Sequence, residues 1–84
     1  MLPLDRIVAE IPRAARENIR VSLREKRGSV GVELRIAAAN GRGTMAETAK
    51  GLRIPLSRIP DVIAALQNAQ RVAQGLSLVA VDRE

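Results

Sequence analysis

The sequence of 84 residues contains no cysteine, no histidine and no aromatic residue. Without cysteine the chain forms no disulfide and no thiolate metal site, and without histidine it lacks the commonest general base and neutral metal ligand. A core without aromatic rings must be built from aliphatic side chains. A domain of this size buries a modest share of its surface, so the missing disulfides and metals favour oligomerisation as a further source of burial.

Catalytic patterns are missing as well. The sequence shows no nucleophile–base pair, metal-ligand cluster or pair of carboxylates with acid–base spacing, and Gly41 with Gly43 makes a turn rather than a phosphate-binding fingerprint. We therefore expect no enzymatic activity, no metal and no cofactor. No apolar run approaches the ~20 residues of a membrane span, and the N-terminus lacks the long apolar segment of a secretory signal. These features favour a cytoplasmic protein, with association with the nucleoid as an option.

Basic residues outnumber acidic ones by 14 to 9, and the net charge is +5. Twelve of the basic residues are arginine and two are lysine. A planar guanidinium can donate two parallel hydrogen bonds to a phosphate or carboxylate, whereas a lysine ammonium acts as a point charge. The charge balance therefore favours a polyanionic partner.

Two segments alternate in the way of half-buried strands. In residues 19–26 the apolar Ile19, Val21 and Leu23 alternate with polar residues, and residues 30–37 alternate likewise. Gly28 provides a hairpin turn between them, and Asn40–Gly43 is a second turn signal. A third strand at 44–49 is predicted from its place between turns. We expect Gly51 to end it, ahead of a fourth strand at 52–56.

After residue 56 the apolar period changes to that of a helix. Ser57 is a good N-cap, Pro60 fits a first turn and Gly75 is a typical stop, so a helix is predicted from about residue 58 to residue 74. Its apolar face contains large side chains and two alanines that would allow another helix to approach closely; it consists of Ile59, Val62, Ile63, Leu66, Ala69 and Ala73.

The chain is divided into an N-terminal arm (1–18), a domain (19–74) and a C-terminal arm (75–84). In the first arm Ile7–Ile11 is predicted to form a short strand that Pro12 ends. This segment is either a loosely held terminus or a strand added to a neighbour's sheet edge. In the second arm Leu76–Val81 is apolar and β-prone, and we expect a partner subunit to cover it, because an exposed strand of this kind aggregates.

Charged residues are expected to gather on one face of the sheet. If the strands form a meander, four arginines and one glutamate share a surface with a serine: Arg20, Ser22, Arg24, Glu33, Arg35 and Arg53. The turns add Lys26, Arg27, Arg42 and Lys50. Such a surface is a plausible track for phosphates. The competing interpretation is a solvated, charge-balanced outer face of an antiparallel sheet.

From Asn18 to Ala69 the sequence resembles the positive-cofactor-four family of single-stranded-DNA-binding transcriptional coactivators, in its bacterial and phage form. The matching stretches are 19–25, Arg27-Gly28, 32–35, 50–52 and 59–66. The order of elements, four strands and then one helix, also agrees. The resemblance implies a strongly curved antiparallel sheet and a homodimer formed through the helix and the adjoining strand, which assigns the apolar helix face above to the dimer interface.

The resemblance also implies that two curved sheets grip single-stranded or melted DNA through backbone contacts and base stacking. Arg24, Arg35 and Lys50 match basic positions of the family, and Gly28 and Gly51 match its turn glycines. The sequence departs from strongly binding members at their aromatic positions, which are occupied here by Lys26, Ala37 and Ala38. Stacking on an aromatic ring contributes roughly 1–3 kcal/mol per base, so binding is expected to be weaker and mainly electrostatic.

The leading hypothesis is a sequence-independent nucleic-acid-binding homodimer that prefers single strands, has the transcription machinery as a further partner, and acts in transcription regulation or DNA metabolism. Its phosphate-binding residues are predicted to be Arg20, Arg24, Lys26, Arg27, Arg35, Arg42, Lys50 and Arg53. One alternative is a dimeric structural or protein-interaction module of the same fold with little DNA affinity. Another is a duplex-DNA repressor made of one strand and two helices, which the two clear strands argue against.

Overall fold

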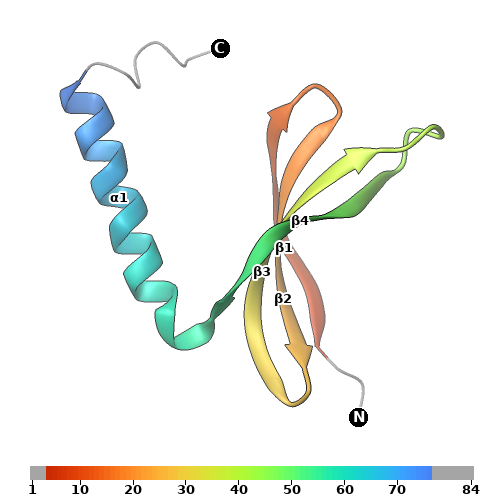
Figure 1. Ribbon diagram of the computed structural model, residues 1–84, viewed down its shortest axis with the longest axis horizontal. Helices are drawn as coiled ribbons and strands as arrows, with labels where there is room; N and C mark the ends of the chain where they lie inside the picture. Colours follow the sequence, from red (N-terminus) through yellow and green to blue (C-terminus); the bar gives the residue numbers. More distant parts are fainter. Residues whose placement is uncertain (1–3, 77–84) are drawn as a thin grey trace.

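The computed structural model describes residues 4–76 and shows a four-stranded sheet followed by one helix (Figure 1). In chain order the elements are β1 (Asp5–Ala14), β2 (Glu17–Lys26), β3 (Ser29–Ala39), β4 (Met45–Pro55), the 3-10 turn η1 (Leu56–Arg58) and α1 (Ile59–Gly75). Each strand pairs antiparallel with the next, so the sheet order is β1-β2-β3-β4. The predicted fold class, an α+β chain with a four-stranded antiparallel sheet and a C-terminal helix, is confirmed.

The β2–β3 hairpin forms as its alternating pattern predicts. Its two turn residues, Arg27 and Gly28, have φ angles of 53° and 80°, and positive φ at both positions is the requirement of the tight turn that matches the twist of paired strands. The turn between β3 and β4 is built around Asn40. The Asn40 side-chain oxygen accepts hydrogen bonds from the backbone N–H groups of Arg42 and Thr44, at 2.8 and 3.1 Å.

The two short strands predicted at 44–49 and 52–56 are one continuous strand, β4, and Gly51 does not end it. The register explains the difference. Arg35 lies opposite Gly51 but Ala37 lies opposite Glu47, so β4 holds three residues where β3 has one. The Thr48 hydroxyl closes this bulge by donating to the Ile36 carbonyl at 2.8 Å. A bulge is created by pairing with a distant strand, so the local sequence pattern did not indicate it.

Pro12 does not end the first strand either, because β1 runs from Asp5 to Ala14 and pairs with β2 of the same chain. Proline is tolerated there because β1 is an edge strand, which has ladder partners on one side only. The predicted N-terminal arm (1–18) thus contributes a strand to the sheet. The division of the chain at residues 18 and 74 stays a prediction.

The predicted helix is present as α1, with different ends. Ser57 is not the N-cap: it lies in η1, and Arg58 occupies the N-cap position without a side-chain capping bond. Gly75 is the last helical residue and does not have the positive φ expected of a glycine stop. The C-terminal arm beyond residue 76, including most of the segment Leu76–Val81, lies outside the described residues.

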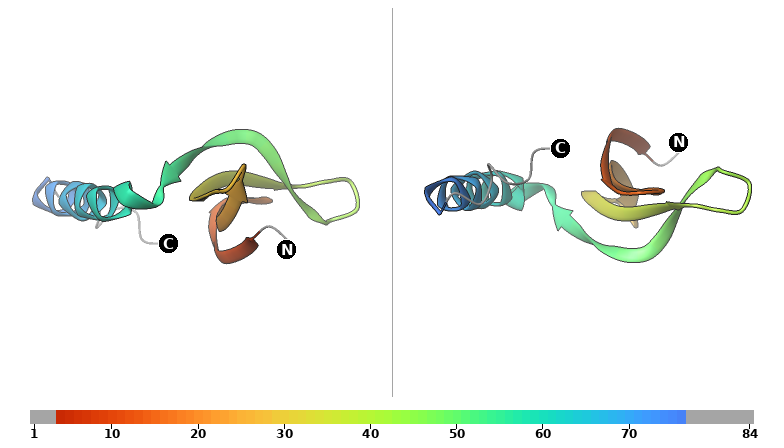
Figure 2. Two further views of the ribbon diagram at one scale, coloured as in Figure 1. Left: turned by 90° about the horizontal axis from the view of Figure 1, so that it is seen from below. Right: turned by 90° about the horizontal axis from the view of Figure 1, so that it is seen from above.

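The sheet twists strongly, and Figure 2 shows β4 arching across the other strands. Pairing places residues of alternate positions on two faces. We define the polar face as Asp5, Glu10, Arg20, Ser22, Arg24, Lys26, Glu33, Arg35, Ala37, Glu47 and Arg53. The apolar face consists of Ile11, Ile19, Val21, Leu23, Val32, Leu34, Ile36, Leu52 and Ile54.

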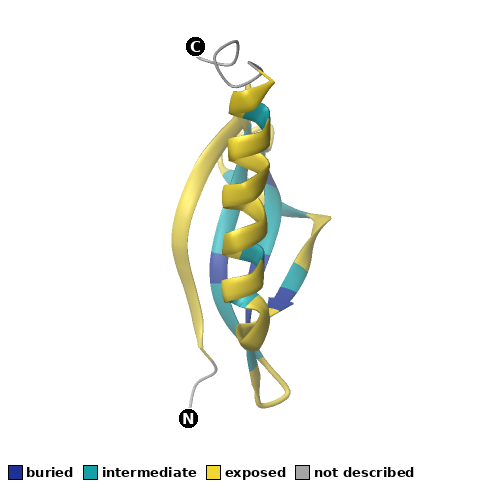
Figure 3. Cartoon of the chain, turned by 90° about the vertical axis from the view of Figure 1, so that its left-hand side faces the viewer, coloured by how far each residue is buried: buried dark blue, intermediate teal, exposed yellow. Residues whose placement is uncertain are grey.

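Burial is distributed in an unusual way between these faces (Figure 3). On the polar face Ser22, Glu33 and Ala37 are buried, whereas Ile54 is the one buried residue of the apolar face among residues 4–76. Leu52 remains 55% exposed. The sheet therefore closes around its charged side and leaves its apolar side open.

Helix α1 does not cover the open apolar face. It extends away from the strands, and its main contacts are with η1 (Figure 1). No residue of α1 is buried. Among residues 4–76 no helix is both long and apolar enough to cross a membrane.

Candidate nucleic-acid interface

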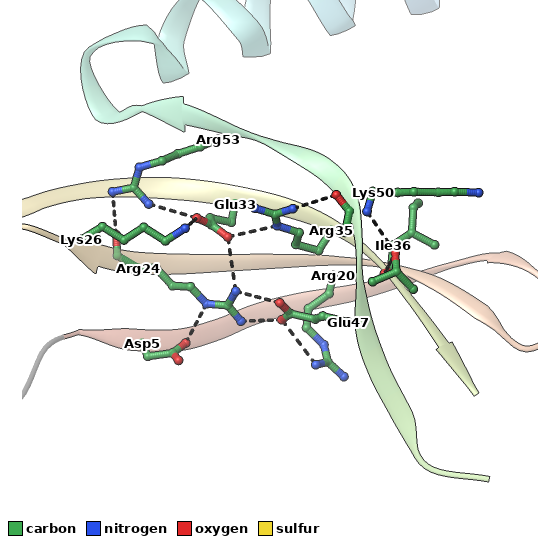
Figure 4. Close-up of polar contacts among 12 residues, drawn as sticks. Asp5, Arg20, Arg24, Lys26, Glu33, Arg35, Ile36, Glu47, Lys50 and Arg53 are labelled. Atoms are coloured by element: carbon green, nitrogen blue, oxygen red, sulfur yellow. Dashed lines mark hydrogen bonds and ion pairs between the residues drawn. The ribbon is translucent and has the colours of Figure 1, made fainter. Parts of the chain in front are cut away.

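Antiparallel pairing brings the predicted basic residues of three strands together on the polar face (Figure 4). Arg20 lies opposite Arg35, and Ser22 lies opposite Glu33, which in turn lies opposite Arg53. This alignment confirms that residues from β2, β3 and β4 share one surface. The surface is not a simple basic patch, however, because each of these arginines has a carboxylate partner.

Glu33 is the centre of the cluster and its side chain is only 1% exposed. Its two carboxylate oxygens lie 3.0–3.3 Å from the cationic groups of four residues drawn from three strands: Arg24, Lys26, Arg35 and Arg53. A buried carboxylate is unfavourable unless it is paired and hydrogen-bonded. Here one anion also relieves the repulsion among four neighbouring cations.

Burial of Glu33 by itself would raise the pKa of its carboxyl group. Hydrogen bonds and charge attraction from Lys26 and Arg35 outweigh that effect and lower the pKa from 4.5 to about 2. Glu33 is therefore ionised throughout the physiological range.

Glu47, from β4, is a second anionic centre. The Arg24 guanidinium forks onto it: Nη1 lies 2.7 Å from Oε1, and Nη2 bonds the other oxygen. Arg20 Nη1 reaches the same carboxylate at 3.4 Å. Two carboxylates of the edge strand complete the arrangement, because Asp5 accepts from Arg24 Nε at 3.0 Å and Glu10 lies 3.4 Å from Arg20.

The pKa values of this pair move in opposite directions. The hydrogen bond from Arg24 lowers the pKa of Glu47, against a smaller opposing effect of burial. The hydrogen bond from Glu47 raises the pKa of Arg24 above its usual range, with burial opposing it and Asp5 adding to it. Both groups therefore remain charged, and each holds the other in place.

Arg53 also has a structural role. Its guanidinium lies directly over Gly31, where an added Cβ would be 2.9 Å from the guanidinium carbon. Its Nη2 donates to the backbone carbonyls of Arg24 and Ser29, at 3.1 and 2.6 Å. Arg53 thus ties β4 to both strands of the β2–β3 hairpin.

The remaining predicted phosphate-binding residues lie around the cluster. Arg27 is at the tip of the β2–β3 hairpin, Arg42 is in the β3–β4 turn, and Lys50 is in the β4 bulge. All three are exposed and form no ion pair with another described residue. Figure 4 shows the Lys50 side chain directed away from the cluster. Lys26 bonds Glu33 but is 57% exposed, so it is accessible as well.

Three carboxylates of the polar face were missed from the sequence: Asp5, Glu10 and Glu47. With Glu33, the polar face therefore has four carboxylates and five cationic side chains. The sequence had predicted one carboxylate and four arginines for the strands. Asp5 and Glu10 were missed because their strand was assigned to an arm. The position of Glu47 depends on the bulge. A usable signal was its charge, because Glu47 is the one charged residue of the segment 44–49.

The predicted dimer-interface residues all lie on α1 and remain uncovered in the described chain. Ile63 and Leu66 are 49% and 64% exposed. Ile59, Val62 and Ala73 are half-buried, and Ala69 is exposed. The helix therefore presents an apolar stripe that its own sheet does not cover. Within residues 4–76 no group of three or more acidic side chains is arranged to hold a metal ion.

Comparisons with solved structures find the same fold in two sources. A PC4 homologue from Burkholderia pseudomallei superposes with a TM-score of 0.76 at 28% identity, covering 81% of this chain and 92% of that one. Its tetragonal crystal form gives 0.73 and 27%, covering 79% and 97%. A bacteriophage T5 homologue of the eukaryotic transcription coactivator PC4 shares the fold, with a TM-score of 0.57 at 17% identity over 92% of this chain and 86% of that one.

Sequence comparison finds no matching family model and no significant match among curated proteins. The likeness therefore rests on three-dimensional structure together with moderate sequence identity. PC4 is positive cofactor four, the family that the sequence resembles. The chain is thus PC4-like, and its resemblance to the bacterial and phage form of that family is confirmed.

Proposed function

We propose that the protein binds nucleic acid without regard to sequence, prefers single strands, and acts in the cytoplasm in transcription regulation or DNA metabolism, without enzymatic activity. The observation that carries this proposal is the gathering of Arg20, Arg24, Arg35 and Arg53 on one curved face of a PC4-like fold. The solved T5 relative is described as implicated in recombination-dependent DNA replication, which supports a role in DNA metabolism. The transcription machinery is a further proposed partner.

Phosphate contacts in this proposal come from two groups of cations. Arg27, Arg42 and Lys50 are exposed and have no ion pair with a described residue, so they are available without rearrangement, and Lys26 is exposed although it bonds Glu33. The arginines of the polar face must exchange a carboxylate for a phosphate. No aromatic ring is present to stack on a base, so the binding energy is mainly electrostatic and falls steeply with salt.

We also propose that the functional unit is a homodimer. Large apolar side chains of both the sheet and the helix are exposed in the single chain, among them Leu52, Ile63, Leu66 and Val72. Soluble proteins seldom leave so many large apolar groups uncovered without a partner. A second copy that buries α1 and the apolar face would supply the core that one chain lacks, and it leaves the polar face accessible.

A second candidate function is a dimeric structural or protein-interaction module with little DNA affinity. One observation favours it: the arginines of the polar face are already paired with Glu33, Glu47 and the carboxylates of β1. Such a charge-balanced face is stable by itself and does not require a polyanion. The two functions differ in whether the cations contribute to binding.

The test is fluorescence anisotropy with labelled oligo(dT) and the double variant Arg27→Ala with Arg42→Ala. Neither side chain forms an ion pair in the described chain, so the fold should be unaffected. Losing two phosphate contacts should reduce the slope of log affinity against log salt by about 1.4. The matched control is Arg58→Ala with Arg71→Ala, which removes the same charge from η1 and α1, outside the sheet. If the two double variants weaken binding equally, the sheet is not the binding surface.

A further inference from the structure

Two donors on the polar face have no partner. Ser22 Oγ is buried in a residue 1% exposed, and Arg20 Nε is buried as well; neither forms a hydrogen bond to any described residue. Buried polar groups are nearly always paired, so unpaired ones need an explanation. Ser22 lies between Arg20 and Arg24 on β2, and alternation puts all three on the same face. Together they form a row of donors that an oxygen-rich anion would satisfy.

The acceptor now facing this row is the chain's own Glu47. The fork that Arg24 makes with its two oxygens is the geometry by which arginine also binds two oxygens of a phosphate. Arg20 adds a longer contact to the same carboxylate through Nη1. Glu47 thus accepts from Arg24 and Arg20, but it leaves Arg20 Nε and Ser22 Oγ unpaired.

The β4 bulge is what brings Glu47 there. Without its two additional residues Glu47 would lie opposite Ala39 instead of Ala37, two positions or about 7 Å further along the sheet. The Thr48 hydroxyl holds the bulge through the Ile36 carbonyl, and Arg35 Nη1 donates to the Ala49 carbonyl at 3.1 Å. The β4 bulge therefore determines where the Glu47 carboxylate lies.

The Glu47 carboxylate can be replaced by a phosphate more easily than the Glu33 carboxylate. Glu33 is 1% exposed and bonded to four residues, so its removal would leave four cations without a common anion. Glu47 is 19% exposed and bonded to two, both on β2. A phosphate that replaced Glu47 would therefore keep the Glu33 centre intact.

We propose that Arg20, Ser22 and Arg24 form a seat for one phosphate of a nucleic-acid backbone, and that Glu47 fills this seat in the free chain. Nucleic acid binds by displacing the Glu47 carboxylate, which then turns towards solvent while the phosphate takes its hydrogen bonds. Glu47 acts as an intramolecular competitor and lowers the affinity. This inference rests on the proposed nucleic-acid binding, and it names the residues that limit it.

The experiment compares Glu47→Gln, Glu25→Gln and Ser22→Ala with the wild-type chain, using labelled oligo(dT) at low salt. Glu47→Gln keeps the shape of the side chain but removes its charge, and should bind roughly fivefold more tightly. Glu25→Gln is the matched control: Glu25 is on the other face of β2, next to Arg24, and forms no ion pair with a described residue. Its affinity should stay within about twofold of wild type.

Ser22→Ala separates the seat from a general charge effect. Because the hydroxyl has no partner in the free chain, its removal should leave the melting temperature unchanged or higher, yet weaken oligo(dT) binding by roughly threefold. If Glu47→Gln binds no more tightly than Glu25→Gln, or if Ser22→Ala binds like wild type, the proposed phosphate seat is contradicted. The proposed nucleic-acid binding would still stand. If wild type itself binds no oligo(dT), both fail.

Discussion

Glu33 is the single residue on which the polar face depends most. One buried carboxylate receives cations from β2, β3 and β4, so it links three strands at their crossing. Removing one partner of a buried ion pair is far more destabilising than the pair is stabilising, because the other partner is left uncompensated. At Glu33 four partners would be left. Glu33 therefore has a structural role, whereas the more exposed Glu47 carboxylate can be displaced by a phosphate.

Acid should unfold the protein through these carboxylates. The pKa of Glu33 is about 2 in the folded chain and 4.5 as an ordinary glutamate, and that of Glu47 is also lowered. A group with a depressed folded-state pKa stabilises the fold above its unfolded pKa and loses that effect as the pH falls. The Glu33 part amounts to roughly 3 kcal/mol, lost between about pH 5 and pH 2.

Urea unfolding followed by far-UV circular dichroism at a series of pH values measures this loss, and the absence of aromatic residues excludes tryptophan fluorescence as a probe. Glu33→Gln is the control, because it has already lost the ionisable group. The variant should be less stable at neutral pH and should change less on acidification. Parallel pH curves for the two proteins would show that Glu33 does not contribute in this way.

At the scale of the elements, β4 is the strand that departs most from a regular sheet. It carries the bulge, crosses close to β3 at Gly51, and leads through η1 into α1. Gly51 has a φ of +153°, and a Cβ there would overlap the carbonyl oxygen of Leu34. The crossing therefore requires glycine for reasons of both space and backbone conformation.

Gly51→Ala should destabilise the protein by roughly 2 kcal/mol or more, because both the backbone and the neighbouring strand must shift. Gly41→Ala is the matched control: Gly41 lies in a turn, its φ is not positive, and nothing lies within 4 Å of the added Cβ. Thermal unfolding of the two variants gives the comparison. Equal melting temperatures would contradict the close crossing at Gly51.

The elements also show what the sequence could and could not predict. The alternation in 19–26 and 30–37 identified β2 and β3, and the 3.6-residue period identified α1, because those patterns depend on local burial. The length of β1 and the continuity of β4 as one strand depend instead on pairing with other strands. Pro12 and Gly51 were therefore read as ends when both lie inside strands. Because strand pairing could not be predicted from the local pattern, Asp5, Glu10 and Glu47 were not placed on the polar face.

At the scale of the whole molecule, residues 4–76 of one chain bury little apolar surface. Only two apolar residues among positions 4–76, Ala37 and Ile54, are buried. An aliphatic core this small cannot offset the conformational entropy lost when about 70 residues fold. The apolar face of the sheet and the apolar stripe on α1 are the exposed surfaces whose burial would enlarge the core. We propose that a second copy of the chain covers them.

Leu66→Asp tests that assembly. Leu66 lies on the apolar stripe of α1 and is 64% exposed in the single chain, so a charge there would be harmless to a monomer but would disrupt a dimer interface. We expect a monomeric or unfolded chain by analytical ultracentrifugation and circular dichroism. Gln67→Asp adds the same charge on the exposed neighbouring position and should leave the assembly intact. A Leu66→Asp protein with wild-type mass and helicity would place the interface elsewhere.

The central claim is that a charge-compensated polar face still binds nucleic acid through phosphate contacts. The most direct test is the affinity of the wild-type chain for labelled single-stranded DNA across a salt series. The account predicts a straight, steep fall of log affinity with log salt, with a slope of about −0.7 for each phosphate contacted. No detectable binding at about 50 mM salt, or an affinity independent of salt, would contradict it.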